Sequence, residues 1–126
     1  MAERSILVVD DELLIRDLLY DFFKDQGWDI SITDNGKRAL ELLKSKEFDL
    51  LLTDIKMPEM DGLDLASKVK MSHPDLPIML MTGYPSVESA VTGLRNKVED
   101  YIIKPFNINQ LFKSIENIVS EGSKSD

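Results

Sequence analysis

The sequence contains no cysteine and a single histidine, His73. Without cysteine the chain has no disulfides and no thiolate metal site, and nothing suggests an oxidising compartment, so we expect a cytoplasmic location. No apolar run approaches the roughly 20 residues that a helix needs to cross a bilayer, and the first residues lack the long apolar core of a signal peptide. The sequence therefore predicts no association with a membrane.

Basic residues are few compared with acidic ones: 15 Lys and Arg stand against 23 Asp and Glu, for a net charge of -8 at pH 7. Such a surface repels a polyanion, so direct nucleic-acid binding is not expected. The 126 residues, 43% hydrophobic and 30% charged, suffice for one domain with one core. We predict this domain over residues 1–120, and a polar tail or the start of a linker over 121–126.

Short apolar runs bounded by polar or turn residues predict five strands, at residues 6–9, 28–33, 48–53, 77–81 and 100–103. Helical patterns fill the intervals, as in the row Leu14, Leu18 and Phe22 at i, i+4 spacing. Alternating strands and helices predict a doubly wound α/β domain, with a parallel sheet covered by helices on both faces. In such sheets, ligands bind beyond the carboxyl ends of the strands.

Polar residues follow four of these strands: Asp10-Asp11, Asp54, Thr82 and Lys104. If the first and third strands are neighbours, three carboxylates share one pocket, and their repulsion raises a pKa or requires a cation. An all-oxygen set of carboxylates suits magnesium. Together with a lysine and a hydroxyl, this is the equipment for phosphoryl transfer to a carboxylate, with Asp54 as the nucleophile.

Four pieces of sequence stand in a characteristic order between Ile6 and about Val119: "VVDDE", "LLLTDIKMPEMDG", "MLMTGY" and "DYIIKPF". In them the chain resembles a response-regulator receiver domain of two-component signalling, of the CheY-like superfamily. The resemblance implies a flavodoxin-like sheet with strand order 2-1-3-4-5. It also implies that Asp54 accepts a phosphoryl group from a sensor histidine kinase or phosphotransfer protein. Such a domain is no enzyme in the usual sense, but it promotes its own aspartyl phosphorylation and dephosphorylation.

The resemblance also assigns a magnesium site. Asp11 and Asp54 would be direct ligands together with the backbone carbonyl of Lys56, and Asp10 would act indirectly, often through water. Lys104 would pair with the phosphoryl group.

Signal output is assigned in the same way. Thr82 would hydrogen-bond to the phosphoryl group, and Tyr101 would be an aromatic switch that turns inward on activation. The readout would be a surface built from the fourth helix, fifth strand and fifth helix. Lys56 and Tyr84, two positions after Asp54 and Thr82, would tune the phosphoryl lifetime by obstructing the attacking water.

The chain departs from the family pattern near the end of the fourth helix. Lys97-Val98 stand where many receivers carry Gly-Ala, so we expect Asn96 to take a left-handed capping conformation. Gly83 stands where Ala is usual, which loosens the loop after Thr82.

Several residues have simpler interpretations. Asp61-Gly62 predicts a turn and helix start, and His73 a solvent-facing loop residue. Tyr101 would serve equally as a half-buried strand aromatic. The methionines are expected in loop and core packing: Met57, Met60, Met79 and Met81.

Other functions remain open at this point. A flavodoxin needs a Gly- and hydroxyl-rich phosphate loop after its first strand, where this chain has Asp10-Asp11-Glu12. An aspartyl phosphatase usually carries a second carboxylate two residues after its nucleophile, and here that residue is Lys56. A structural module would tolerate Asp54→Asn. For a receiver, the output is a downstream protein, a fused effector domain, or a homodimer that forms on phosphorylation.

Overall fold

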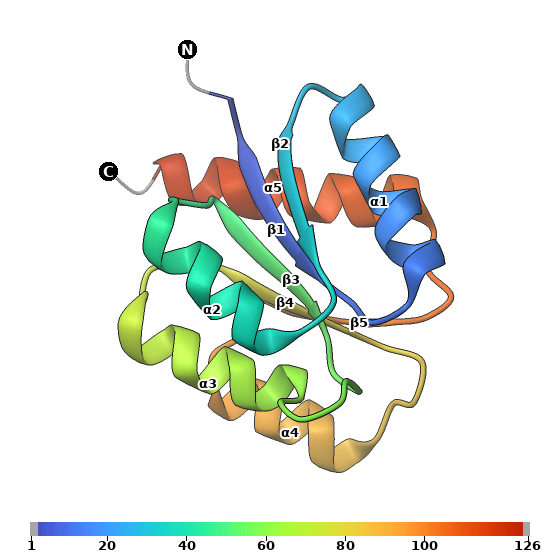
Figure 1. Ribbon diagram of the computed structural model, residues 1–126, viewed down its shortest axis with the longest axis vertical. Helices are drawn as coiled ribbons and strands as arrows, with labels where there is room; N and C mark the ends of the chain where they lie inside the picture. Colours follow the sequence, from blue (N-terminus) through green and yellow to red (C-terminus); the bar gives the residue numbers. More distant parts are fainter. Residues whose placement is uncertain (1–2, 125–126) are drawn as a thin grey trace.

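The computed structural model describes residues 3–124 as one sheet with helices on both faces (Figure 1). The strands are β1 (Ser5–Val9), β2 (Asp29–Thr33), β3 (Leu50–Asp54), β4 (Ile78–Thr82) and β5 (Asp100–Ile103). The helices are α1 (Leu13–Asp25), α2 (Gly36–Ser45), α3 (Gly62–Ser72), α4 (Val87–Arg95) and α5 (Ile108–Lys124). Within these residues, no helix has the length and apolarity required to span a membrane.

All strand pairs are parallel, and the strand order is β2-β1-β3-β4-β5. This confirms the predicted fold. β3 lies between β1 and β4, with Val9 beside Thr53 and Asp54 beside Met81. The end of β3 is therefore flanked by the ends of both neighbours, and the polar residues that follow the strands lie together at this edge.

Side chains alternate between two cores because successive strand residues face opposite sides of the sheet. Leu7 and Leu51 face the core under α2 and α3, whereas Ile6 and Leu50 face the core under α1 and α5. Figure 1 shows the two layers, with α1 and α5 on one face and α2, α3 and α4 on the other. Burial on both faces explains why β1, β3 and β4 are nearly unbroken apolar runs.

The helix ends and the methionine side chains follow local features of the sequence. Gly27 has a positive φ of 85° just beyond α1, and Asp61 caps α3 by accepting from the N–H of Asp64. Asn107 accepts from the N–H of Gln110 at 3.0 Å, as a cap of α5 does. The methionines pack as predicted: Met57, Met79 and Met81 are buried, and Met60 lies against one core.

Three local features differ from expectation. The left-handed residue after α4 is Lys97, with φ 59°, while Asn96 keeps φ -82° and caps the helix through its backbone N–H. The prediction for Asn96 was therefore wrong: the chain turns one residue later. His73 is half-buried instead of solvent-facing, with its ring 2.8 Å from Ser72 Oγ and 3.2 Å from the Leu43 carbonyl. α5 continues to Lys124, through part of the segment expected as a polar tail.

Candidate phosphoryl-acceptor site

Asp54 lies in a rigid setting at the carboxyl end of β3, where only 4% of its surface is exposed. Its Oδ1 accepts a hydrogen bond from the N–H of Ile55 at 3.0 Å. The chain then turns so sharply that Gly62 N–H donates to the carbonyl of Ile55 at 2.8 Å. A Cβ at position 62 would collide with the Asp54 carbonyl, so glycine is required there. The start of α3 thereby fixes the backbone of Asp54.

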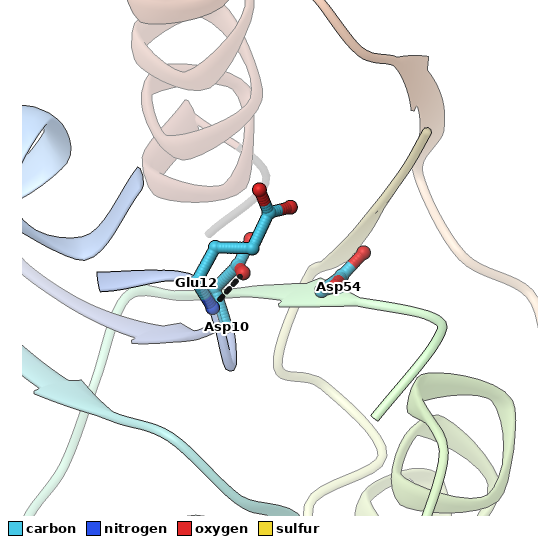
Figure 2. Close-up of side chains that lie close together, drawn as sticks. All are labelled: Asp10, Glu12 and Asp54. Carbon is cyan, nitrogen blue, oxygen red and sulfur yellow. Dashed lines mark hydrogen bonds between the residues drawn. The ribbon is translucent and has the colours of Figure 1, made fainter. Parts of the chain in front are cut away.

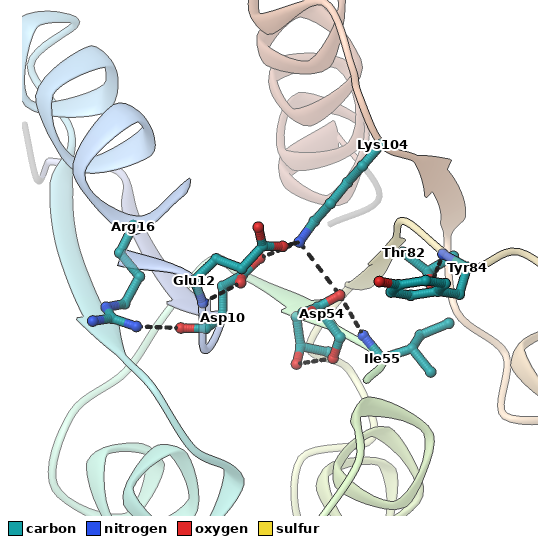
Figure 3. Close-up of polar contacts among 9 residues, drawn as sticks. Asp10, Glu12, Arg16, Asp54, Ile55, Thr82, Tyr84 and Lys104 are labelled. Carbon is teal, nitrogen blue, oxygen red and sulfur yellow. Dashed lines mark hydrogen bonds and ion pairs between the residues drawn. The ribbon is translucent and has the colours of Figure 1, made fainter. Parts of the chain in front are cut away.

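Asp10 follows β1 and is fully buried. Its Oδ1 accepts from the N–H of Glu12 and its Oδ2 from Lys104 Nζ, both at 2.8 Å. Arg16 donates to the Asp10 carbonyl at 2.8 Å (Figure 3). Both carboxylate oxygens of Asp10 are therefore engaged by this chain.

Lys104 approaches the same point from the end of β5. Its backbone N–H donates to the Thr82 carbonyl at 2.8 Å, which sets the direction of the side chain. Its Nζ lies 2.8 Å from Asp10 and Glu12 and 3.5 Å from Asp54 Oδ1. One ammonium thus faces three carboxylates (Figure 3).

This crowding perturbs the ionisation of the site. Burial, reinforced by the charge of Asp10, raises the pKa of Asp54 to about 6 although Lys104 acts in the opposite direction. Burial also raises the pKa of Asp10. For Lys104, burial lowers the pKa, but the hydrogen bonds to Asp10 and Glu12 outweigh it and the net pKa is raised. The lysine stays charged, while Asp54 is an unusually basic carboxylate.

The carboxylates of Asp10, Glu12 and Asp54 have oxygens within 4.8 Å of one another (Figure 2). A compact set of oxygen donors with excess negative charge fits a hard divalent cation such as magnesium. Asp11 lies outside this group with an exposed side chain, yet its charge contributes to the raised pKa of Asp54, so it is near the pocket.

Thr82 is fully buried at the end of β4, and its Oγ1 accepts from the N–H of Tyr84 at 3.0 Å. Tyr84 is 75% exposed, and its ring points toward the Asp54 side of the pocket in Figure 3. Lys56 is also exposed, in the turn after Asp54. The two residues expected to tune phosphoryl lifetime therefore lie on the solvent side of the site.

Tyr101 is half-buried and lies against the core under α2 and α3. Its hydroxyl is 2.6 Å from Ser89 Oγ and accepts from the N–H of Ser86 at 3.3 Å. The phenol is thus tied to the first turn of α4.

Sequence reasoning missed Glu12 and Arg16 at the site and Ser89 beside Tyr101. A signal existed for Glu12, because it directly follows Asp10-Asp11. Arg16 and Ser89 lie at ordinary helical positions that carry no comparable signal.

Comparisons with known proteins agree with this geometry. The family model described as the response regulator receiver domain matches residues 6–116. The transcriptional regulatory protein ZraR of Klebsiella oxytoca is 40% identical over 107 residues, 85% of this chain and 24% of that protein. The regulatory protein AtoC of Escherichia coli K12 is 42% identical over 110 residues, 87% of this chain and 24% of that protein. The chain therefore spans about a quarter of the length of these curated relatives.

Solved structures show the same fold over nearly the whole chain. A CheY-like receiver domain protein from Methanospirillum hungatei JF-1 matches with a TM-score of 0.96 and 30% identity, covering 99% of this chain and 100% of that chain. Response regulator TrrA of Thermotoga maritima, solved in complex with Mg(2+)-BeF, matches with a TM-score of 0.83 and 33% identity, covering 91% and 98%.

Proposed function

Because this chain belongs to the response regulator receiver domain family, we propose that Asp54 accepts a phosphoryl group from a phosphohistidine of a sensor kinase or phosphotransfer protein. The observation that carries the proposal is the buried, basic carboxylate of Asp54, fixed at a strand end with Lys104 3.5 Å away. Phosphoryl transfer depends mainly on positioning and on neutralising charge, and the site supplies both.

In the transfer step, a carboxylate oxygen of Asp54 attacks phosphorus, the P–N bond to the donor imidazole breaks, and its electron pair stays with the imidazole. Oδ1 is occupied by the N–H of Ile55, which favours Oδ2 as the attacking oxygen. Lys104 would then pair with the phosphoryl oxygens and Thr82 would bond to them through its hydroxyl. Water attacking the same phosphorus reverses the modification, so the domain promotes both its phosphorylation and its dephosphorylation.

Magnesium is the proposed cofactor, with Asp11, Asp54 and the carbonyl of Lys56 as ligands and Asp10 acting through water. When bound, it neutralises charge on the phosphoryl group and the carboxylates. The division between the first two aspartates is supported by their surroundings: Asp10 already uses both oxygens within the protein, whereas Asp11 is exposed. Asp11→Ala should therefore weaken magnesium binding more than Asp10→Ala does in a calorimetric titration, and equal losses would contradict the assignment.

Output is proposed to run through Thr82 and Tyr101 to the surface of α4, β5 and α5. Moving such a switch from mostly off to mostly on needs roughly 5 kcal/mol of differential stabilisation. Support comes from exposed apolar side chains on this surface, at Val87, Leu94 and Ile103. They suit a downstream protein, a fused effector domain or a second copy of the chain.

The test is labelling with a small phosphodonor, acetyl phosphate, and magnesium, followed by intact-mass measurement. The wild-type chain should gain one phosphoryl group that survives acid and is lost in base, as an acyl phosphate is. Asp54→Asn and a chelator should each abolish the gain. Full labelling of Asp54→Asn would place the acceptor elsewhere.

A further inference from the structure

Glu12 occupies the N-cap position of α1 without capping the helix. Short side chains are favoured there because they accept hydrogen bonds from the first turn. Glu12 has the extended backbone of a cap, with φ -89° and ψ 117°, but its side chain makes no capping bond. The four other helices are each capped by a side chain: Asn35, Asp61, Ser86 and Asn107. Among the described residues, α1 is thus the one helix whose N-cap side chain makes no capping bond, and this N-cap lies at the pocket. Such a departure from local preference indicates that the Glu12 side chain has another role.

That side chain contacts Lys104 instead. Glu12 Oε1 lies 2.8 Å from Nζ, as close as Asp10 Oδ2, whereas Asp54 Oδ1 lies 3.5 Å away. An ammonium has three N–H donors. Two of them have short partners in Asp10 and Glu12, and the carboxylate that is to be phosphorylated has the longest contact.

We propose that Glu12 is a positioning residue that holds Lys104 back from Asp54 until a phosphoryl group arrives. The inference rests on the proposed function of Asp54. Asp10 is buried with both oxygens bonded, so its contact with the lysine persists. The Glu12 side chain is 60% exposed, and water solvates its carboxylate once the lysine has left. A phosphoryl group with a charge of about -2 attracts the ammonium more strongly than one carboxylate does.

Until then, the contact between Glu12 and Lys104 opposes the movement of the lysine toward Asp54. Glu12 therefore slows phosphoryl acceptance, and weakening its contact should accelerate it. An exposed ion pair is weak, so the expected gain is roughly two- to fivefold.

The sharpest variant is Glu12→Asp. It keeps the charge, but the side chain is shorter and favoured at the N-cap, so it should turn to the first turn of α1 and release Lys104. Glu12→Gln keeps the length and removes the charge. Asp17→Asn is the matched control, since it removes an exposed charge from the same helix.

The first measurement is the labelling rate with acetyl phosphate at a magnesium concentration that saturates each variant, as determined by titration. Both Glu12 variants should label roughly two- to fivefold faster than wild type, and Asp17→Asn at the wild-type rate. Slower or unchanged labelling of Glu12→Asp would overturn the inference, and slower labelling would instead indicate a direct role for this carboxylate in the reaction.

The second measurement is a crystal structure of Glu12→Asp without metal. The distance from Lys104 Nζ to Asp54 should fall below the 3.5 Å of the wild-type chain, and an unmoved lysine overturns the inference. Should wild type take up no phosphoryl group, the proposed function fails, while the position of this lysine still decides whether Glu12 restrains it.

Discussion

The third and fifth strands end at the same edge of the sheet but in opposite environments. β3 is buried along its whole length, has a strand on each side, and is clamped at its end by the start of α3. β5 is an edge strand with both end residues exposed, and α4 beside it leaves Val87 and Leu94 open to solvent. The proposed acceptor carboxylate, Asp54, lies on β3, and the proposed aromatic switch, Tyr101, lies on β5.

This contrast separates the part of the proposed mechanism that needs a fixed position, the end of β3, from the part that needs to change conformation, β5 and α4. A nucleophile displaced by even 1 Å loses much of its advantage, so a close-packed setting suits the role proposed for Asp54. A switch needs two conformations of similar free energy, which an edge strand and a helix with few buried side chains can provide. Substitutions in both regions test this division, beginning with the rigid strand.

Gly62→Ala should cause the largest effect, because the added methyl group collides with the carbonyl of Asp54. We expect a loss of about 3 kcal/mol in the free energy of unfolding and a severe loss of labelling at Asp54. Urea denaturation and acetyl phosphate labelling measure the two. Gly83→Ala is the matched control, since its methyl group would meet open space, and it should change neither. Normal labelling of a stable Gly62→Ala variant would show that β3 is not clamped.

Asp54→Asn should stabilise the metal-free protein at neutral pH. The pKa of Asp54 is about 6 in the folded chain against 3.8 in a model peptide, so the folded state binds the proton more tightly. Well below pH 3.8 the carboxyl is protonated in both the folded and the unfolded state, and its burial then costs no charge-related stability. As pH rises through about 6, burial of the charge removes up to about 3 kcal/mol of stability.

In a chelator, Asp54→Asn should therefore exceed wild type in free energy of unfolding by about 1–3 kcal/mol at pH 8, and by less at pH 5. Added magnesium should reduce this difference in free energy of unfolding, because Asp54 is a proposed magnesium ligand in the wild-type chain. Urea unfolding at several pH values provides the measurement, with the exposed substitution Asp17→Asn as a control. A difference in free energy of unfolding that does not change with pH would mean that burial does not raise the pKa of Asp54.

The grouping of the site residues at the strand ends could be predicted from sequence. The ends of parallel strands must share one edge of the sheet, so Asp10, Asp54, Thr82 and Lys104 could be grouped from their positions in the chain alone. The requirement for glycine at position 62 could not be predicted, because it depends on the close approach of its backbone to the Asp54 carbonyl, which no local sequence pattern encodes.

The side-chain contacts made by the first residues of α1 and α4 were less predictable from sequence. Glu12 meets Lys104 across 92 positions, and Ser89 meets Tyr101 across 12. Both contacts depend on side-chain rotamers rather than on strand order. The error at Asn96 has a local origin. Lys97 N–H donates to the Leu94 carbonyl and Val98 N–H to the Gly93 carbonyl, a helix-ending pair of bonds that makes Lys97 left-handed, whereas propensity alone favoured asparagine.

Ser89→Ala should loosen the edge of the sheet without disturbing the acceptor. It removes the 2.6 Å hydroxyl contact with Tyr101, at a cost of about 1 kcal/mol. Tyr101→Phe removes the same contact from the other side, so the two losses should not add in a double-mutant cycle. Labelling of Asp54 should stay within about twofold of wild type. Additive losses would show that the contact does not tie the tyrosine to α4.

The smallest expected effect concerns how long the phosphoryl group persists. Tyr84 and Lys56 lie exposed at the mouth of the site, on the loops after β4 and β3. Hydrolysis requires water in line with the bond to Asp54, and bulk at this opening obstructs that approach. The ammonium of Lys56 could act in either direction, but magnesium and Lys104 would already meet the charge there, so the steric effect should dominate.

We therefore expect Tyr84→Ala to shorten the lifetime of phosphorylated Asp54 by roughly two- to threefold, and Tyr84→Ala combined with Lys56→Ala to shorten it further. Magnesium affinity should stay nearly constant, since only the backbone carbonyl of Lys56 is proposed as a ligand. Val87→Ala is the control: it shortens a similarly exposed side chain on α4, away from Asp54, and the lifetime should not change. Loss of label after removal of the phosphodonor gives the rate. If the double variant loses its label at the wild-type rate or more slowly, these side chains do not shield the phosphoryl group. Its lifetime must then be set by the buried residues at the strand ends, such as Asp10 and Thr82.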